Sequence, residues 1–161
     1  MRKIILLTLL FLIGIQSICL SSKTPPSKFQ WIESTSERSV FFDTESLTYS
    51  KDSNGQIKII DAWLYMCFDE SYAQKLLQDR KNKNLSTTEF DGLSFSLWHT
   101  NFDNEEQKVK LLSVSNFDKD DAAIGSHSYP NAAWHQIKPN TYFEIWCKKI
   151  SEYIQNKSNN Q

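Results

Sequence analysis

Histidines and aspartates are the residues of this sequence best suited to catalysis or metal binding, and they form no known signature. The histidines are His99, His127 and His135, and none belongs to a His-Glu-x-x-His or similar motif. Asp43 and Asp61 are of the type that works as an acid–base pair, but the sequence does not fix their separation. We therefore predict no catalytic residue, no metal site and no cofactor.

A group of carboxylates at 118–121 suggests a calcium site, because hard cations prefer several oxygen ligands. The segment is Asp-Lys-Asp-Asp, and the glycine and closing glutamate of an EF-hand loop are absent from the required offsets. We predict a solvated turn instead.

Beyond the N-terminal segment the sequence has two cysteines, Cys67 and Cys147, and both stand at positions that pattern as buried. In an oxidising compartment two such thiols usually pair. We predict a disulfide between them, closing a loop of about 80 residues and tying a central strand to the last helix. The alternative is that both are unpaired core cysteines, too far apart to bridge.

The sequence has five tryptophans, and most stand at strand or helix periodicity, which predicts core positions. Trp134 differs because it lies in a segment bounded by Pro130 and Pro139. Exposed tryptophans are favoured at binding hot spots. Trp134 is therefore our candidate binding-surface residue.

The sequence predicts that most of these histidines, aspartates, cysteines and tryptophans lie on or beside β-strands. Alternating apolar and polar residues, with turn clusters between them, predict an antiparallel sheet of about six strands, over 29–34, 39–43, 56–68, 93–102, 108–117 and 124–129. Asn54-Gly55 predicts a tight hairpin turn. Both faces of 56–68 are largely apolar, which is typical of a central strand, with Cys67 sharing the parity of Trp63 and Tyr65.

The last element has helical periodicity. Trp146, Cys147 and Ile150 lie on one side, and Glu144 follows Thr141 in capping-box spacing. We predict an amphipathic C-terminal helix packed on one face of the sheet, which gives an α+β fold. A short helix followed by an exposed loop is predicted within 69–84.

The N-terminus has the pattern of a secretory signal peptide over 1–21. Arg2 and Lys3 precede an apolar run that is too short to span a bilayer, and cleavage sites follow at Cys19 and Ser21. Cys19 also raises the alternative of a lipid anchor, but Ile18 stands where lipoprotein processing usually needs a small residue.

After the leader we predict a linker over 22–28, one domain over 29–156 and a disordered tail over 157–161. The predicted localisation is exported: periplasmic, cell-surface or secreted. No later segment reaches the length of a transmembrane helix.

Charge and composition exclude several classes of protein. Lys and Arg number 18 against 19 Asp and Glu, and no basic stripe is present, which argues against a nucleic-acid partner. Only four glycines and four prolines occur beside 13% aromatic residues, which indicates a packed domain rather than a collagen-like or disordered chain.

The segment Phe41-Phe42-Asp43-Thr44-Glu45-Ser46-Leu47 lies between Trp31 and the strand with Ala62-Trp63-Leu64. It resembles the Tyr/Phe-Asp-x-x-Ser opening of the surface-adhesin protein E family of bacterial envelope proteins. The second half is similar too, through Val109–Asp118, the segment Trp134-His135-Gln136-Ile137-Lys138-Pro139-Asn140 and a terminal helix with Cys147.

The resemblance implies an antiparallel sheet with a C-terminal helix held to it by a disulfide. It also implies a surface-exposed or periplasmic domain, with host-matrix binding in some members. Members often carry a cysteine just before the strand that matches Lys108–Phe117, and Asn104 stands there in this sequence. The resemblance then leaves Cys67 as the candidate partner of Cys147.

We accordingly predict a non-enzymatic binding module of the bacterial envelope, adhesin-like toward a host-matrix or envelope protein. Two alternatives come from other classes. One is a small secreted hydrolase or inhibitor whose site combines residues such as Asp43 and His99. The other is a structural accessory subunit of an envelope complex.

Overall fold

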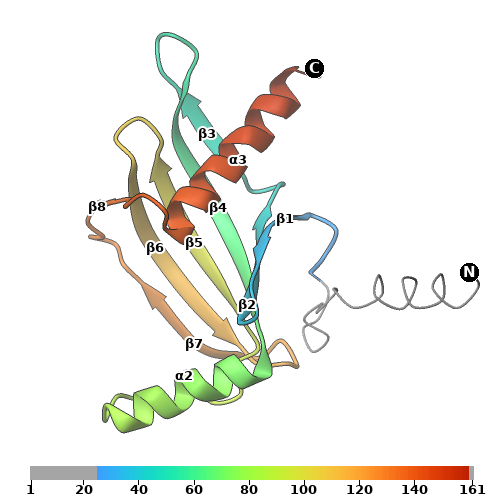
Figure 1. Ribbon diagram of the computed structural model, residues 1–161, viewed down its shortest axis with the longest axis vertical. Coiled ribbons are helices and arrows are strands. Elements are labelled where there is room, and N and C mark those ends of the chain that lie inside the picture. The colour runs from blue at the N-terminus through green and yellow to red at the C-terminus, as the bar shows by residue number, and fades with distance from the viewer. Residues whose placement is uncertain (1–24, 160–161) are drawn as a thin grey trace, which may run out of the picture.

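A computed structural model describes residues 25–159 (Figure 1). The predicted signal peptide, Cys19, the first part of the linker and residues 160–161 lie outside the described residues. Eight strands form one antiparallel sheet in the order β1-β2-β4-β5-β6-β7, with β3 paired to β4 and β8 paired to β6. The elements are β1 (Phe29–Ser34), β2 (Arg38–Asp43), β3 (Thr48–Lys51), β4 (Ile57–Phe68), α2 (Glu70–Asn82), β5 (Phe95–Asp103), β6 (Lys108–Phe117), β7 (Ala123–Ser128), β8 (His135–Gln136) and α3 (Tyr142–Asn159).

The α+β class and the C-terminal helix are confirmed, and two short strands raise the strand number to eight. The hairpin turn predicted at Asn54-Gly55 joins β3 to β4. Gly55 has a φ of +80°, a conformation that glycine adopts without a Cβ penalty, and the Asp52 carboxylate accepts the amides of Asn54 and Gln56. β4 is central, as predicted, and pairs with β2, β3 and β5.

Helix α3 packs on one face of the sheet, which we call the helix face (Figure 1). Trp146 is 1% exposed, and its indole Nε1 donates to Glu33 on β1 at 2.8 Å. Burying a large apolar side chain stabilises a fold by about 1.5–3 kcal/mol. The buried cluster at this face includes Val40, Phe42, Ile60, Ala62, Leu64, Met66, Phe102, Trp146, Cys147, Ile150 and Ile154.

The start of α3 follows the predicted capping box only in part. The Glu144 carboxylate accepts the backbone N–H of Asn140 at 2.7 Å, while the Thr141 hydroxyl donates to the carbonyl of Lys138 instead of accepting an amide. At its other end α3 continues through Asn159, so 157–159 are helical rather than part of a disordered tail.

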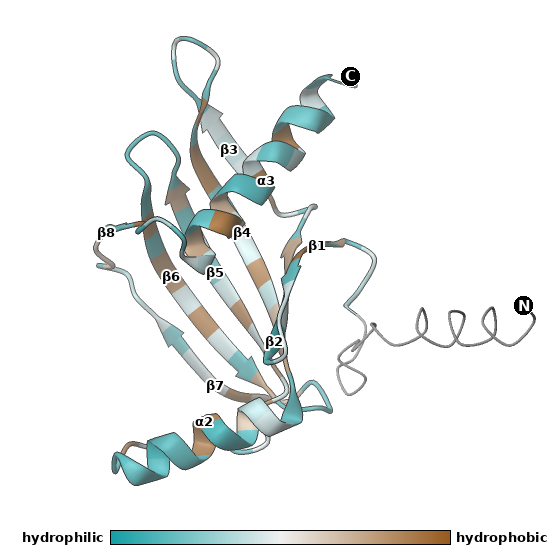
Figure 2. Ribbon diagram, in the orientation of Figure 1, coloured by the Kyte–Doolittle hydropathy of each residue, from teal (hydrophilic) through white to brown (hydrophobic). Residues whose placement is uncertain are grey.

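Helix α2 lies at the end of the sheet where β4 finishes (Figure 1). Its N-cap is Asp69, whose carboxylate accepts the amide of Ser71 at 2.9 Å. Ala73 is the buried residue of α2, and Figure 2 shows most of this helix as hydrophilic. The helix predicted within 69–84 is thus present, and it lies largely in solvent.

The predicted disulfide between Cys67 and Cys147 is not formed. Successive side chains of a strand point to opposite faces, and Met66 takes the helix-face position next to Cys67. Cys67 instead packs with Tyr65 and Phe95 on the other side of the sheet. The sheet therefore separates the two sulfur atoms, which corrects the prediction.

Cys147 contacts Asn104 from the turn between β5 and β6. Its Sγ lies 3.6 Å from the side-chain oxygen of Asn104. Burial, with a smaller contribution from the Asp103 charge, raises the pKa of the Cys147 thiol to about 11. The helix is thus held to the sheet by apolar packing and hydrogen bonds, and Cys147 is a protonated core residue.

Candidate binding face

The side of the sheet away from α3, which we call the open face, carries a row of polar residues. Because Ile60 and Ala62 point to the helix face, Asp61 points away from it. Asp61 on β4 lies opposite Asn101 on β5, and Asn101 lies opposite Lys110 on β6. Cross-strand partners share one face, so three neighbouring strands place these side chains together.

Asp61 is the centre of this row. One of its carboxylate oxygens lies 2.8 Å from Nε2 of His99, and the other accepts the side-chain amide of Asn101 at 2.6 Å. The Asp61 side chain is 34% exposed and that of His99 is 25% exposed. Both oxygens therefore have partners while the group stays open to solvent, so the three side chains are fixed before any ligand arrives.

Trp63 fixes the imidazole from a second direction. Its ring stacks on that of His99, with centroids 4.5 Å apart and planes 7° from parallel. The two residues are cross-strand partners on β4 and β5, which accounts for the contact. Aromatic stacking adds about 0.5–1.5 kcal/mol beyond the burial of area. His99 is thus held by a hydrogen bond in its plane and by a ring on its face.

Trp134 lies beside this row. The short strand β8 pairs with Lys108 and Val109 of β6, and this pairing brings the preceding Trp134 next to Lys110. The Lys110 ammonium lies 4.8 Å from the centroid of the Trp134 ring, within cation–π range. Trp134 is 38% exposed, as the sequence suggests for this residue. Its role in binding stays a prediction.

Aromatic rings support the rest of the open face. Tyr65 lies 5.1 Å from Phe29 and 4.9 Å from Phe95, and Phe95 stacks on Phe117 at 4.7 Å, all measured between ring centroids. Burial, followed by interaction with Cys67, raises the pKa of the Tyr65 hydroxyl. The cluster on this face is built from strand residues, without a contribution from α2 or α3.

The residues considered for catalysis do not come together as proposed. Asp43 accepts hydrogen bonds from Lys28 at 2.6 Å and from the amides of Glu45 and Ser46, so the hydrogen-bond partner of His99 is Asp61 rather than Asp43. Cavities of about 580, 400 and 370 Å³ lie on the described surface, and none is lined by His99 or Asp61.

Two of the remaining polar candidates, His127 and Asp118, serve local structure. His127 on β7 pairs with Glu89 at 2.5 Å, and His135 is exposed on β8. The Asp118 carboxylate accepts the amides of Asp120 and Ala122, which makes 118–122 a turn. Within residues 25–159, no group of three or more His, Cys, Asp or Glu side chains could hold a metal ion, and no helix has the length and hydropathy of a membrane span.

Comparison with known proteins adds no assignment: no family model, curated protein or solved structure matches this chain.

Sequence reasoning did not find the group around Asp61. The parity of β4 puts Asp61 and Trp63 on one face, and the parity of β5 puts His99 and Asn101 on one face. Which residues meet across the two strands depends on their register. The register could not be read, because α2 and a loop separate β4 from β5.

Proposed function

We propose that this chain is an exported, non-enzymatic binding module whose open face binds another protein. The observation that carries the proposal is the partly exposed group of Trp63, Trp134 and Lys110 around the hydrogen-bonded Asp61 and His99. Tryptophans beside charged groups that are already ordered are typical of interface hot spots.

Preorganisation favours binding at this face. Ordering a flexible side chain at an interface costs about 0.5–1.5 kcal/mol. Asp61 already holds His99 and Asn101 in place, and Lys110 already lies over Trp134. A partner protein that docks here would order few further side chains.

The exported location rests on the leader pattern at 1–21, and the adhesin-like aspect rests on the resemblance to the surface-adhesin protein E family. Asn104, at the position where that resemblance expects a cysteine, is in contact with Cys147. This contact supports the resemblance. A host-matrix or envelope protein is therefore the proposed partner.

A solid-phase assay against immobilised matrix proteins such as collagen and laminin tests the proposal. The wild-type protein should bind saturably to at least one of them. Replacing Trp134 by Ala should weaken binding at least tenfold, since hot-spot truncations cost about 2 kcal/mol or more. The matched control is Tyr49→Ala, because Tyr49 on β3 is 43% exposed, lies near a lysine, and pairs with the helix-face residue Ile60.

Equal losses in Trp134→Ala and Tyr49→Ala would mean that the open face is not the binding surface. Absence of saturable binding to any matrix protein would remove the adhesin-like proposal. The hydrolase or inhibitor and the accessory subunit stay as alternatives that no specific observation favours.

A further inference from the structure

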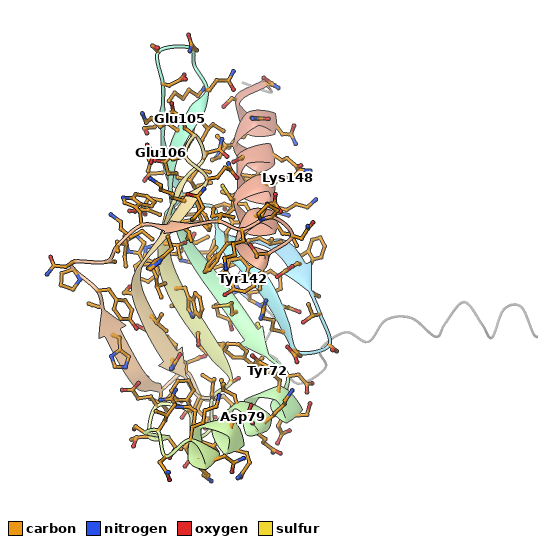
Figure 3. All side chains as sticks on the ribbon, turned by 60° about the vertical axis from the view of Figure 1, so that its left-hand side comes forward. Tyr72, Asp79, Glu105, Glu106, Tyr142 and Lys148 are labelled. Carbon is orange, nitrogen blue, oxygen red and sulfur yellow. The ribbon has the colours of Figure 1, made fainter. Side chains whose placement is uncertain are left out.

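A groove of about 370 Å³ lies on the helix face, between the start of α3 and α2. Its floor is formed by β4, β5 and β6, including Trp98 and Val114. Figure 3 shows Tyr142, at the start of α3, above Tyr72 on α2, and both line the groove. Ligand sites are usually concave and mostly apolar, with a few polar groups that fix the ligand's orientation. This groove has that composition.

Arg38 is the one charged residue that lines the groove among the described residues. Its guanidinium lies 5.1 Å from the ring centroid of Tyr142 and 5.8 Å from that of Trp146. Its side chain is 20% exposed, and its Nε, a buried atom, has no hydrogen-bond partner in the described part of the chain. The aromatic rings thus hold a cation at the groove wall without using its hydrogen-bond donors.

Glu33 neutralises this cation only in part. The nearest contact between Glu33 and Arg38 is 3.7 Å, which is too long for a hydrogen bond. The same Glu33 oxygen accepts the indole N–H of Trp146 at 2.8 Å, and this bond holds the carboxylate away from Arg38. Arg38 therefore keeps donors for a second carboxylate, which a guanidinium binds with two parallel hydrogen bonds.

The adjacent hollow has the opposite charge. A cavity of about 580 Å³ shares Phe68, Phe90 and Leu93 with the groove. It is lined by the acidic residues Glu70, Asp91, Asp118 and Asp120 and by one cation, Lys119. An anionic group would be repelled there and attracted to Arg38, so the charges define where the polar end of a ligand would lie.

We propose that the groove binds a single-chain amphipathic carboxylate of the medium-chain fatty acid class. The carboxylate bonds to Arg38, and the alkyl chain lies over Leu76, Phe90 and Leu93. A volume of 370 Å³ is near the lower end of the range for ligand sites, which suits one alkyl chain rather than a two-chain lipid. The site is on the face opposite the proposed protein-binding surface and does not depend on it.

Titration calorimetry with decanoate below its micellar concentration tests this proposal. The protein should bind one decanoate per chain, and octanoate should bind more weakly, by about fourfold for each methylene lost. Decylammonium, which has the same chain and the opposite charge, should bind at least tenfold more weakly than decanoate. Equal binding of the two ions would overturn the proposal, because the chain alone would then explain the affinity.

Two variants locate the site. Arg38→Met keeps the aliphatic stem and should weaken decanoate binding about ten- to a hundredfold, the effect of losing hydrogen bonds to a charged group. Lys148→Met removes one charge from the exposed outer side of α3, and it should change the affinity less than twofold (Figure 3). Unchanged binding in Arg38→Met, or equal losses in both variants, would overturn the site. If Arg38→Met does not fold, the comparison of the two ions in the wild-type protein decides.

Discussion

Replacing Asn104 by Cys should create the disulfide that the wild-type chain does not form. The Asn104 side-chain oxygen lies 3.6 Å from the Cys147 sulfur, so the ends of the two side chains already meet. Cys67 cannot compete, because the sheet lies between it and Cys147. We expect the Asn104→Cys variant to oxidise in air to a 104–147 bond.

The magnitude follows from the loop that the bond would close. Residues 104 and 147 are 43 positions apart, for which loop-closure entropy gives about 4 kcal/mol of stabilisation. The substitution also removes the hydrogen bond from the Asn104 amide to the carbonyl of Ile57, worth about 1 kcal/mol. The free energy of unfolding should therefore rise by about 3 kcal/mol, which moves the urea midpoint up by about 1–3 M.

Urea unfolding with and without a reductant measures this change, and intact mass reports whether two hydrogens are lost. Asn104→Ser is the control for the lost amide, and Asn104→Cys combined with Cys147→Ser is the control for the unpaired thiol. Only Asn104→Cys should gain stability, and a reductant should abolish the gain. A variant that keeps reduced thiols in air, or that pairs with Cys67, would refute the placement of α3.

Three further predictions concern Cys147, Asp43 and Gly125. Burial raises the pKa of Cys147 to about 11, so iodoacetamide should modify it at pH 8 about a hundredfold more slowly in the folded than in the guanidinium-unfolded protein, as peptide mass spectrometry would report. Burial raises the pKa of Asp43, but hydrogen bonds from Lys28 and two backbone amides outweigh that effect and lower it below the ordinary 3.8. The ionised Asp43 carboxylate therefore stabilises the fold fully above its ordinary pKa, and this stabilisation is lost as pH falls through the lowered pKa. Asp43→Asn should be less stable than the wild type at pH 7. In urea titrations below about pH 4, the variant should lose less stability than the wild type does. A Cβ at Gly125 would lie 2.6 Å from the Cβ of Glu89, so Gly125→Ala should cost about 1–3 kcal/mol in urea unfolding, and an unchanged midpoint would contradict this contact.

The architecture was predictable because apolar periodicity is local. The alternation in β4 and the helical spacing of Trp146 and Ile150 both appear in the structure as expected. The wrong disulfide shows the limit of this reasoning. Both faces of β4 are apolar, so periodicity could not show which face α3 covers, and Cys67 points to the other one.

The candidate sites depend on relations between distant segments. Asp61 and His99 meet only through the register of β4 and β5. The groove at Arg38 exists because α2 and α3 leave part of the helix face uncovered, and the position of α2 is not encoded in a periodic pattern. Trp134 was accessible to sequence reasoning because its flanking prolines mark a surface segment.

The hydrogen bond between Glu33 and Trp146 joins residues 113 positions apart, and this separation affects how the protein is made. Because synthesis runs from the N-terminus, β1 to β6 are made before α3, and residues such as Ile60 and Leu64 stay uncovered until α3 emerges. Non-local contacts of this kind slow folding. A nascent chain that pauses or terminates before Tyr142 would expose the apolar helix face of the sheet. We expect such fragments to aggregate.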